Sequence, residues 1–140
     1  MPSWNEINLE VNNDPDPNAC DKVRLKYILE LETYVNRTVI AYYSGYWQKQ
    51  LPTGVHPECA ITDLDMNGLM AVVHKVDRAR GLDLILHTPG GGIEATRAIV
   101  EYLYSMFGKD LRVIVPHIAL SAGTMIACSA RTIVLENIHR

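Results

Sequence analysis

The sequence of 140 residues has little cysteine, no clustered basic charge and no long apolar run, and each absence excludes a class of protein. Its three cysteines, Cys20, Cys59 and Cys128, are odd in number and share no Cys-x-x-Cys or Cys/His spacing. The odd number does not suggest a disulfide framework, and the missing ligand spacing does not suggest a zinc site. The sequence therefore predicts free thiols in a reducing cytoplasm, and no metal site.

Charge and hydropathy exclude further classes. Thirteen basic residues against 16 acidic ones give a net charge of −3, and the basic residues are scattered singly, which does not favour nucleic-acid binding. The start of the chain carries Glu6 and Glu10 and lacks a basic region before an apolar core, which argues against a signal peptide. Apolar runs fall far short of the ~20 residues of a membrane-spanning helix. We expect a cytoplasmic protein, while peripheral association with the inner membrane face stays open.

The chain divides into an N-terminal arm, residues 1–20, and one domain, residues 21–140. The division follows the turn-forming, proline-broken run NNDPDPN at residues 12–18. Expected helices cover residues 21–35, 63–80, 93–107 and 121–130, expected strands cover residues 38–43, 82–86, 111–115 and 132–135, and residues 46–60 form a loop. This alternation predicts an α/β fold with a mostly parallel sheet and right-handed βα crossovers.

Three consecutive glycines, Gly90 to Gly92, follow a buried strand and open a helix. Glycine reaches positive φ angles and lets the backbone approach a ligand closely. Outward-pointing amides at such a turn either cradle a phosphate or stabilise the negative oxygen of a tetrahedral intermediate. The phosphate interpretation is weak, because neither a Gly-Lys-Ser/Thr ending nor Gly-x-Gly-x-x-Gly spacing is present. A tight strand-to-helix turn explains a lone glycine triplet equally well.

Ser121 lies where the strand 111–115 gives way to a helix of small residues. The positive end of the helix dipole can favour a nucleophile there. Ala122 and Gly123 leave room for a substrate backbone, and the Ala122 amide is a candidate oxyanion donor. Taken alone, Ser121 is more simply explained as a helix N-cap. Because parallel strands place their carboxyl ends at one edge of the sheet, however, the glycine loop and Ser121 can face one another.

The segments HTPGGG at residues 87–92 and VPHIALSAGTMIA at residues 115–127 together resemble the serine dehydrogenase proteinase family. This bacterial and archaeal branch is related to signal peptide peptidase A within the Clp/crotonase superfamily. PSWNEI at residues 2–7, VIAYYSG at residues 39–45 and DMNGLM at residues 65–70 are also similar to it, so the resemblance covers most of the chain. Despite the family name, the sequence has no dinucleotide fingerprint and does not predict a dehydrogenase.

The resemblance implies a Clp/crotonase-like fold and a serine endopeptidase that forms an acyl-enzyme on Ser121. It matches the amides of Gly91 and Ala122, with Gly90 in the same loop, to the oxyanion hole. It implies no cofactor, substrates that are peptides or unfolded proteins, and a homo-oligomer, because relatives form rings.

A serine hydroxyl needs a base to accept its proton. In relatives the base lies downstream of the serine: a lysine held neutral by burial, or the histidine of Clp protease. Here no lysine follows Lys109, and the chain ends 19 residues after Ser121. His117 and His139 are the candidate base or cleft-lining residues, although a backbone-fixing loop histidine and a frayed terminal residue explain them more simply. We therefore expect the N-terminal part of a catalytic domain, truncated at its C-terminus.

Two other functions compete with the peptidase. A crotonase-type acyl-CoA enzyme would use the same amides for a thioester oxyanion without needing a serine, but the SAGT environment of Ser121 suits a nucleophile. A non-catalytic oligomerising module is favoured by the absence of an evident base and by the apolar helices. Reactivity of Ser121 with a serine-directed probe tests the peptidase, and binding of CoA thioesters that Ser121→Ala leaves unaffected would support the crotonase-type enzyme.

Overall fold

The computed structural model describes residues 2–46, 49–51 and 54–136. Contacts divide the chain into two compact units, Met1–Asn36 and Arg37–Arg140. The contact boundary thus falls after Asn36, whereas the sequence predicted an arm that ends at residue 20. Whether residues 21–36 belong to the catalytic domain stays a prediction.

The first unit consists of two helices, α1 (Trp4–Asn13) and α2 (Ala19–Val35). The start of α1 is fixed by a capping box, in which the Glu6 amide donates to Ser3 Oγ and the Ser3 amide donates to Glu6 Oε2. Glu10 joins the two helices, because its carboxylate accepts hydrogen bonds from Lys26 Nζ at 2.6 Å and from the Tyr27 hydroxyl at 2.9 Å. Much of the expected N-terminal arm, residues 1–20, is therefore helical.

The second unit is built on a parallel sheet with strand order β1-β4-β5-β6. Its strands are β1 (Thr38–Tyr43), β4 (Leu82–His87), β5 (Leu111–Val115) and β6 (Thr132–Leu135). Their bounds agree with the expected strands to within one residue, and the α/β class with a mostly parallel sheet is confirmed. The stretch expected to be a loop also holds a short antiparallel pair, β2 (Gln50–Leu51) and β3 (Gly54–Val55), followed by a 3₁₀ turn at Pro57–Cys59.

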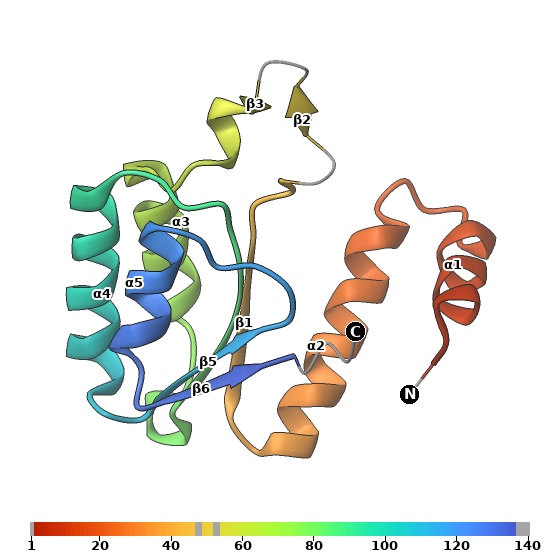
Figure 1. The fold of residues 1–140 in the computed structure, drawn as a ribbon. Coiled ribbons are helices and arrows are strands. Elements are labelled where there is room, and N and C mark those ends of the chain that lie inside the picture. Colours follow the sequence, from red (N-terminus) through yellow and green to blue (C-terminus); the bar gives the residue numbers. More distant parts are fainter. Residues whose placement is uncertain (1, 47–48, 52–53, 137–140) are drawn as a thin grey trace. The chain divides into compact units, whose positions relative to one another are not determined.

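Three helices, α3 (Asp63–Val73), α4 (Ile93–Phe107) and α5 (Ala122–Ser129), lie on one side of the sheet (Figure 1). Alternate residues of the central strands face them and form the buried core with side chains from each helix: Leu82, Leu84, Leu86, Leu111, Val113, Val115, Leu69, Val73, Ile99, Leu103 and Ile126. Helix α3 ends before the expected residue 80. The Asp77 side chain accepts from the Ala79 amide and its carbonyl accepts from Thr38 Oγ1, so the chain forms a 3₁₀ turn at Arg78–Arg80 instead.

The amino ends of three strands are tied together by a buried carboxylate. Asp83 of β4 is fully buried and accepts from Nε of both Arg37, at 2.6 Å, and Arg112, at 3.0 Å. Arg37 also donates to Asp110 and to two main-chain carbonyls, so it links the start of β1 to the segment before β5. A buried charge is tolerated only when it is paired in this way.

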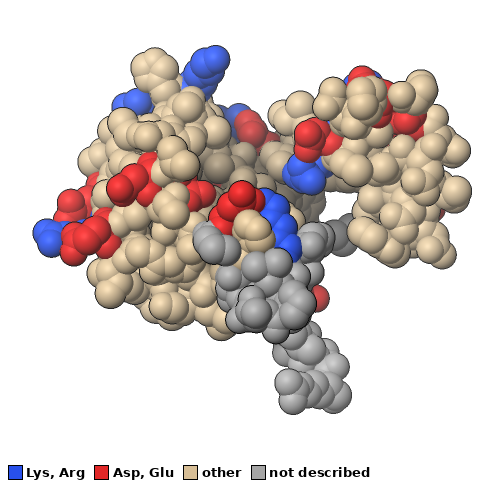
Figure 2. Space-filling view, turned by 90° about the horizontal axis from the view of Figure 1, so that it is seen from above, with Lys and Arg blue, Asp and Glu red and all other residues tan. Residues whose placement is uncertain are grey.

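The charged side chains on the face seen in Figure 2 are of mixed sign and form no continuous basic surface among the residues drawn in colour. None of the helices in the described ranges is both long and apolar enough to cross a membrane. Nowhere in those ranges do three or more His, Cys, Asp or Glu side chains converge as metal ligands would.

Candidate active site

Ser121 occupies the N-cap position of α5 but does not act as a cap. Its backbone has φ 49° and ψ −116°, whereas a capping residue normally has extended backbone angles. Its side chain accepts no hydrogen bond from the helix amides. The hydroxyl of Ser121 is therefore exposed and is not used to cap the helix. The positive φ angle of this residue, which is not glycine, is a backbone strain that costs about 1–3 kcal/mol and is most common at functional sites.

The loop that leads to Ser121, residues 116–120, is here called the serine loop, and it pairs with the segment directly after β4. The amide of Thr88 donates to the Ile118 carbonyl, and the amide of Leu120 donates to the Thr88 carbonyl, each at 3.1 Å. These two bonds form a parallel bridge between Thr88 and Ala119. The parallel topology thus brings the glycine loop and the serine loop together at the carboxyl edge of the sheet.

Gly90 lies directly against Ser121. A Cβ atom at Gly90 would lie 2.8 Å from the Leu120 carbonyl oxygen and 2.9 Å from Ser121 Cβ, and the φ angle of Gly90 is +103°. Both observations require glycine at this position. The amide of Gly90 is already used, since it donates to Thr88 Oγ1 at 3.1 Å in a buried hydrogen bond.

Gly91 is fixed by the backbone of Ile61, the buried residue two positions before α3. The Ile61 amide donates to the Gly90 carbonyl, and the Gly92 amide donates to the Ile61 carbonyl, both at 2.9 Å. A Cβ atom at Gly91 would lie only 2.1 Å from the Ile61 nitrogen, so no side chain fits there. No sequence motif predicts this contact, because Ile61 is 30 residues away from Gly91 in the chain.

The orientation of the Gly91 amide follows from this pairing. In a planar trans peptide the N–H points opposite to the C=O, and no cis peptide bond is present in the described chain. Because the Gly90 carbonyl points to Ile61, the Gly91 N–H points away from it. Within the described ranges the amides of Gly91 and Ala122 donate to no other group, and Ala122 N lies 3.3 Å from the position of a Cβ on Gly90. The two unused donors thus belong to the residues that directly follow Gly90 and Ser121, which are in contact with each other.

Of the two candidate bases, His117 and His139, the structure describes only His117. His117 is exposed, and its ring stacks on that of His87 with 6.0 Å between centroids. His139 lies outside the described residues. His87, the last residue of β4, is 6% exposed, and the centroid of its ring lies 4.7 Å from that of Tyr43. Its Nδ1 is buried and has no hydrogen-bond partner in the described chain. Burial, together with the neighbouring His117, lowers the pKa of His87.

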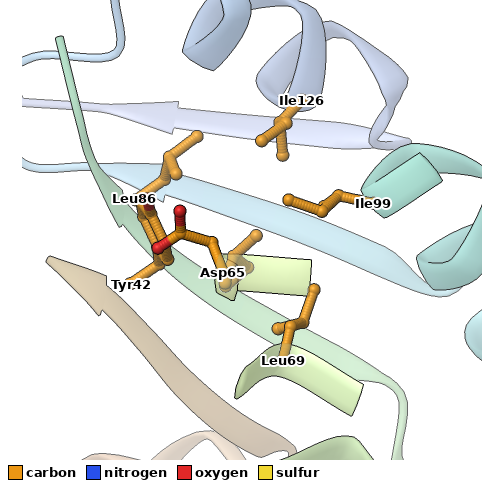
Figure 3. Close-up of a pocket in the computed structure, with 7 residues that line it drawn as sticks. Tyr42, Asp65, Leu69, Leu86, Ile99 and Ile126 are labelled. Carbon is orange, nitrogen blue, oxygen red and sulfur yellow. The ribbon is translucent and has the colours of Figure 1, made fainter. Parts of the chain in front are cut away.

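A small cavity lies in the core between the sheet and the helices (Figure 3). Its volume is about 10 Å³, which is room for about one water molecule, so it does not accept a substrate side chain. At its wall the Tyr42 hydroxyl points to Asp65, and burial, followed by the charge of Asp65, raises the pKa of Tyr42. Its lining residues are Tyr42, Asp65, Leu69, Leu84, Leu86, Ile99 and Ile126.

Comparison with known proteins assigns the chain to a family. The model of the ClpP-like SDH-type serine proteinases matches residues 17–139. Two uncharacterised proteins of Methanocaldococcus jannaschii, MJ0137 and MJ1495, are 34% and 32% identical over 114 residues, which are 81% of this chain but 39% and 38% of those proteins. No solved structure matches the chain significantly. The chain has a Clp-like α/β fold and belongs to the family of ClpP-like SDH-type serine proteinases.

Proposed function

We propose that this chain carries the nucleophile and the oxyanion hole of a serine endopeptidase. The observation that supports this proposal best is the environment of Ser121: a strained backbone, a hydroxyl that does not cap its helix, and two amides without acceptors beside it. The amides of Gly91 and Ala122 are the proposed oxyanion donors. Gly90 contributes by close contact with Ser121 rather than by its amide, which is bonded to Thr88.

In the proposed reaction Ser121 Oγ attacks the carbonyl carbon of a peptide bond, and a base accepts the hydroxyl proton. The amides of Gly91 and Ala122 stabilise the negative oxygen of the tetrahedral intermediate, where one such donor typically contributes about 10²–10³ in rate. The C–N bond then breaks, the amine takes a proton and leaves, and water hydrolyses the ester on Ser121. His117 and His139 stay the candidate bases.

Peptides and unfolded protein segments are the proposed substrates, and self-association into an oligomer is proposed from the family. The alternative of an acyl-CoA enzyme would need the two amides alone. The strained backbone of Ser121 favours the peptidase over that alternative, because an enzyme that uses only amides gains nothing from it.

A fluorophosphonate probe tests the proposal, because it phosphonylates activated serine hydroxyls. We expect the chain to be labelled at Ser121, as located by peptide mass mapping, and Ser121→Ala to remain unlabelled. Ser105→Ala is the matched control, since Ser105 is an exposed serine of α4 whose hydroxyl donates to the Tyr102 carbonyl. Labelling of Ser121→Ala at the level of the unmodified chain, or no labelling of the unmodified chain, would contradict the proposal.

The same assay tests the candidate base in the described chain. If His117 accepts the proton of Ser121, His117→Ala will lower the rate of labelling by about 10²-fold or more. An unchanged rate would leave His117 as a loop residue, and His139→Ala is then measured in the same way.

A further inference from the structure

Thr88 is the one described residue that bonds to both loops of the proposed site. It follows β4, is completely buried, and precedes the glycine loop by two positions. Its main-chain amide and carbonyl both bond to the serine loop, at Ile118 and Leu120. Its hydroxyl accepts the amide of Gly90 at 3.1 Å. The main chain of Thr88 therefore bonds to the serine loop, and its hydroxyl bonds to the glycine loop.

The methyl group of Thr88 has a separate contact. A Cβ atom at Gly123, in the first turn of α5, would lie 2.5 Å from Thr88 Cγ2. The methyl group thus packs against the helix that begins directly after Ser121. Serine would keep the hydroxyl and lose this contact, whereas valine would keep a methyl group and lose the acceptor for Gly90. Threonine is the residue that provides both.

We propose that Thr88 is a positioning residue that sets the distance between the Ser121 hydroxyl and the Gly91 amide. The inference rests on the proposed function, because it assigns a role within that same site. The Gly90 amide and carbonyl are held on two sides, by Thr88 Oγ1 and by the Ile61 amide, and together they fix the peptide that carries the Gly91 N–H. The same threonine anchors the serine loop through its backbone.

Such a link matters because an oxyanion hole works only at short range. Its donors must lie within hydrogen-bond distance of the oxygen in the transition state, and a displacement of about 1 Å costs about 10²-fold in rate. Without the Thr88 hydroxyl, the Gly90 amide would be buried and unpaired, which favours rotation of the adjoining peptides toward another acceptor. Rotation there would turn the Gly91 N–H away from the oxyanion.

The test compares the second-order rate constant of fluorophosphonate labelling in three variants with that of the unmodified chain. We expect Thr88→Val to lower it by about 10–100-fold and Thr88→Ser to keep it within about threefold. Thr38→Val is the matched control: Thr38 is also a buried threonine, 3% exposed, and its hydroxyl donates to Asp77 at the amino end of the sheet. Thr38→Val should lower the thermal midpoint without changing the labelling rate below that midpoint.

A second measurement does not depend on reactivity. In ¹H–¹⁵N spectra, Thr88→Val should shift the amide signals of Gly90, Gly91 and Ala122 and speed hydrogen exchange at Gly90, whereas Thr38→Val should leave them in place. If the unmodified chain is not labelled, the proposed function fails, and these spectra still decide whether Thr88 holds the two loops. A folded Thr88→Val variant with unchanged spectra, or one labelled at the rate of the unmodified chain, would overturn the inference.

Discussion

Substitutions of Ser121 can measure the backbone strain at the proposed nucleophile. At φ 49° and ψ −116° the Cβ atom of an ordinary residue is crowded by its own main chain, whereas glycine is not. We therefore compare Ser121→Gly with Ser121→Ala. Both substitutions remove a hydroxyl that makes no capping hydrogen bond, so they differ only in the Cβ atom.

The magnitude follows from two opposing terms. Removal of the Cβ relieves about 1–3 kcal/mol of backbone strain. The freer unfolded chain of the glycine variant offsets about 0.4–1 kcal/mol of this gain. We expect Ser121→Gly to be more stable than Ser121→Ala by about 1–2 kcal/mol, which is about 3–8 °C in thermal midpoint for a domain of this size.

Urea unfolding followed by circular dichroism measures the difference, with thermal melting as a second assay. Ser105 is the matched control position, because it lies within α4 with ordinary helical geometry. There the order should be reversed, with Ser105→Gly less stable than Ser105→Ala by about 1 kcal/mol. If glycine is the less stable variant at both positions, Ser121 is not strained in solution and the reasoning fails.

Three further predictions concern stability elsewhere in the second unit. Asp83→Asn should lower the free energy of unfolding, measured with urea, by about 3–5 kcal/mol, because it leaves the guanidinium groups of Arg37 and Arg112 without their buried partner. Gly91→Ala should abolish fluorophosphonate labelling and cost more than about 2 kcal/mol, because the added Cβ would meet backbone at 2.1 Å. The free energy of unfolding should fall as the pH drops below 6.5, because the pKa of His87 is lowered in the folded protein and the unfolded chain takes up the proton first.

Each of these has a matched comparison. Asp110→Asn, at a carboxylate that is 59% exposed, should cost at most about 1 kcal/mol, and an equal loss at Asp83 and Asp110 would contradict the first prediction. Gly68→Ala, in a helix with open space around it, should instead stabilise by about 0.5–1 kcal/mol. His87→Phe keeps an aromatic ring beside Tyr43 and should flatten the pH dependence; an unchanged slope would assign it to another group.

Most of the parallel sheet could be predicted from local pattern. Short apolar runs such as those at residues 38–43 and 111–115 are long enough for strands and too short for buried helices. Helix α1 was missed although its capping box, Ser3 and Glu6, is visible in the sequence. The early end of α3 was not predictable, because a hydroxyl from a distant strand, that of Thr38, binds the Asp77 carbonyl.

By itself, the sequence determined the family, the alternation of strands and helices, and the presence of Ser121 and the glycine loop at successive strand ends. The tertiary structure decided how those residues are used. Whether an amide of the glycine loop is free or bonded depends on Ile61, which is 30 residues away in the chain, and on the hydroxyl of Thr88, whose main chain bonds to the loop before Ser121. Local pattern records which conformations a segment prefers, whereas hydrogen bonds between distant segments form only when the chain has folded. For that reason the family followed from the sequence, while the unused donors beside Ser121 followed from the structure.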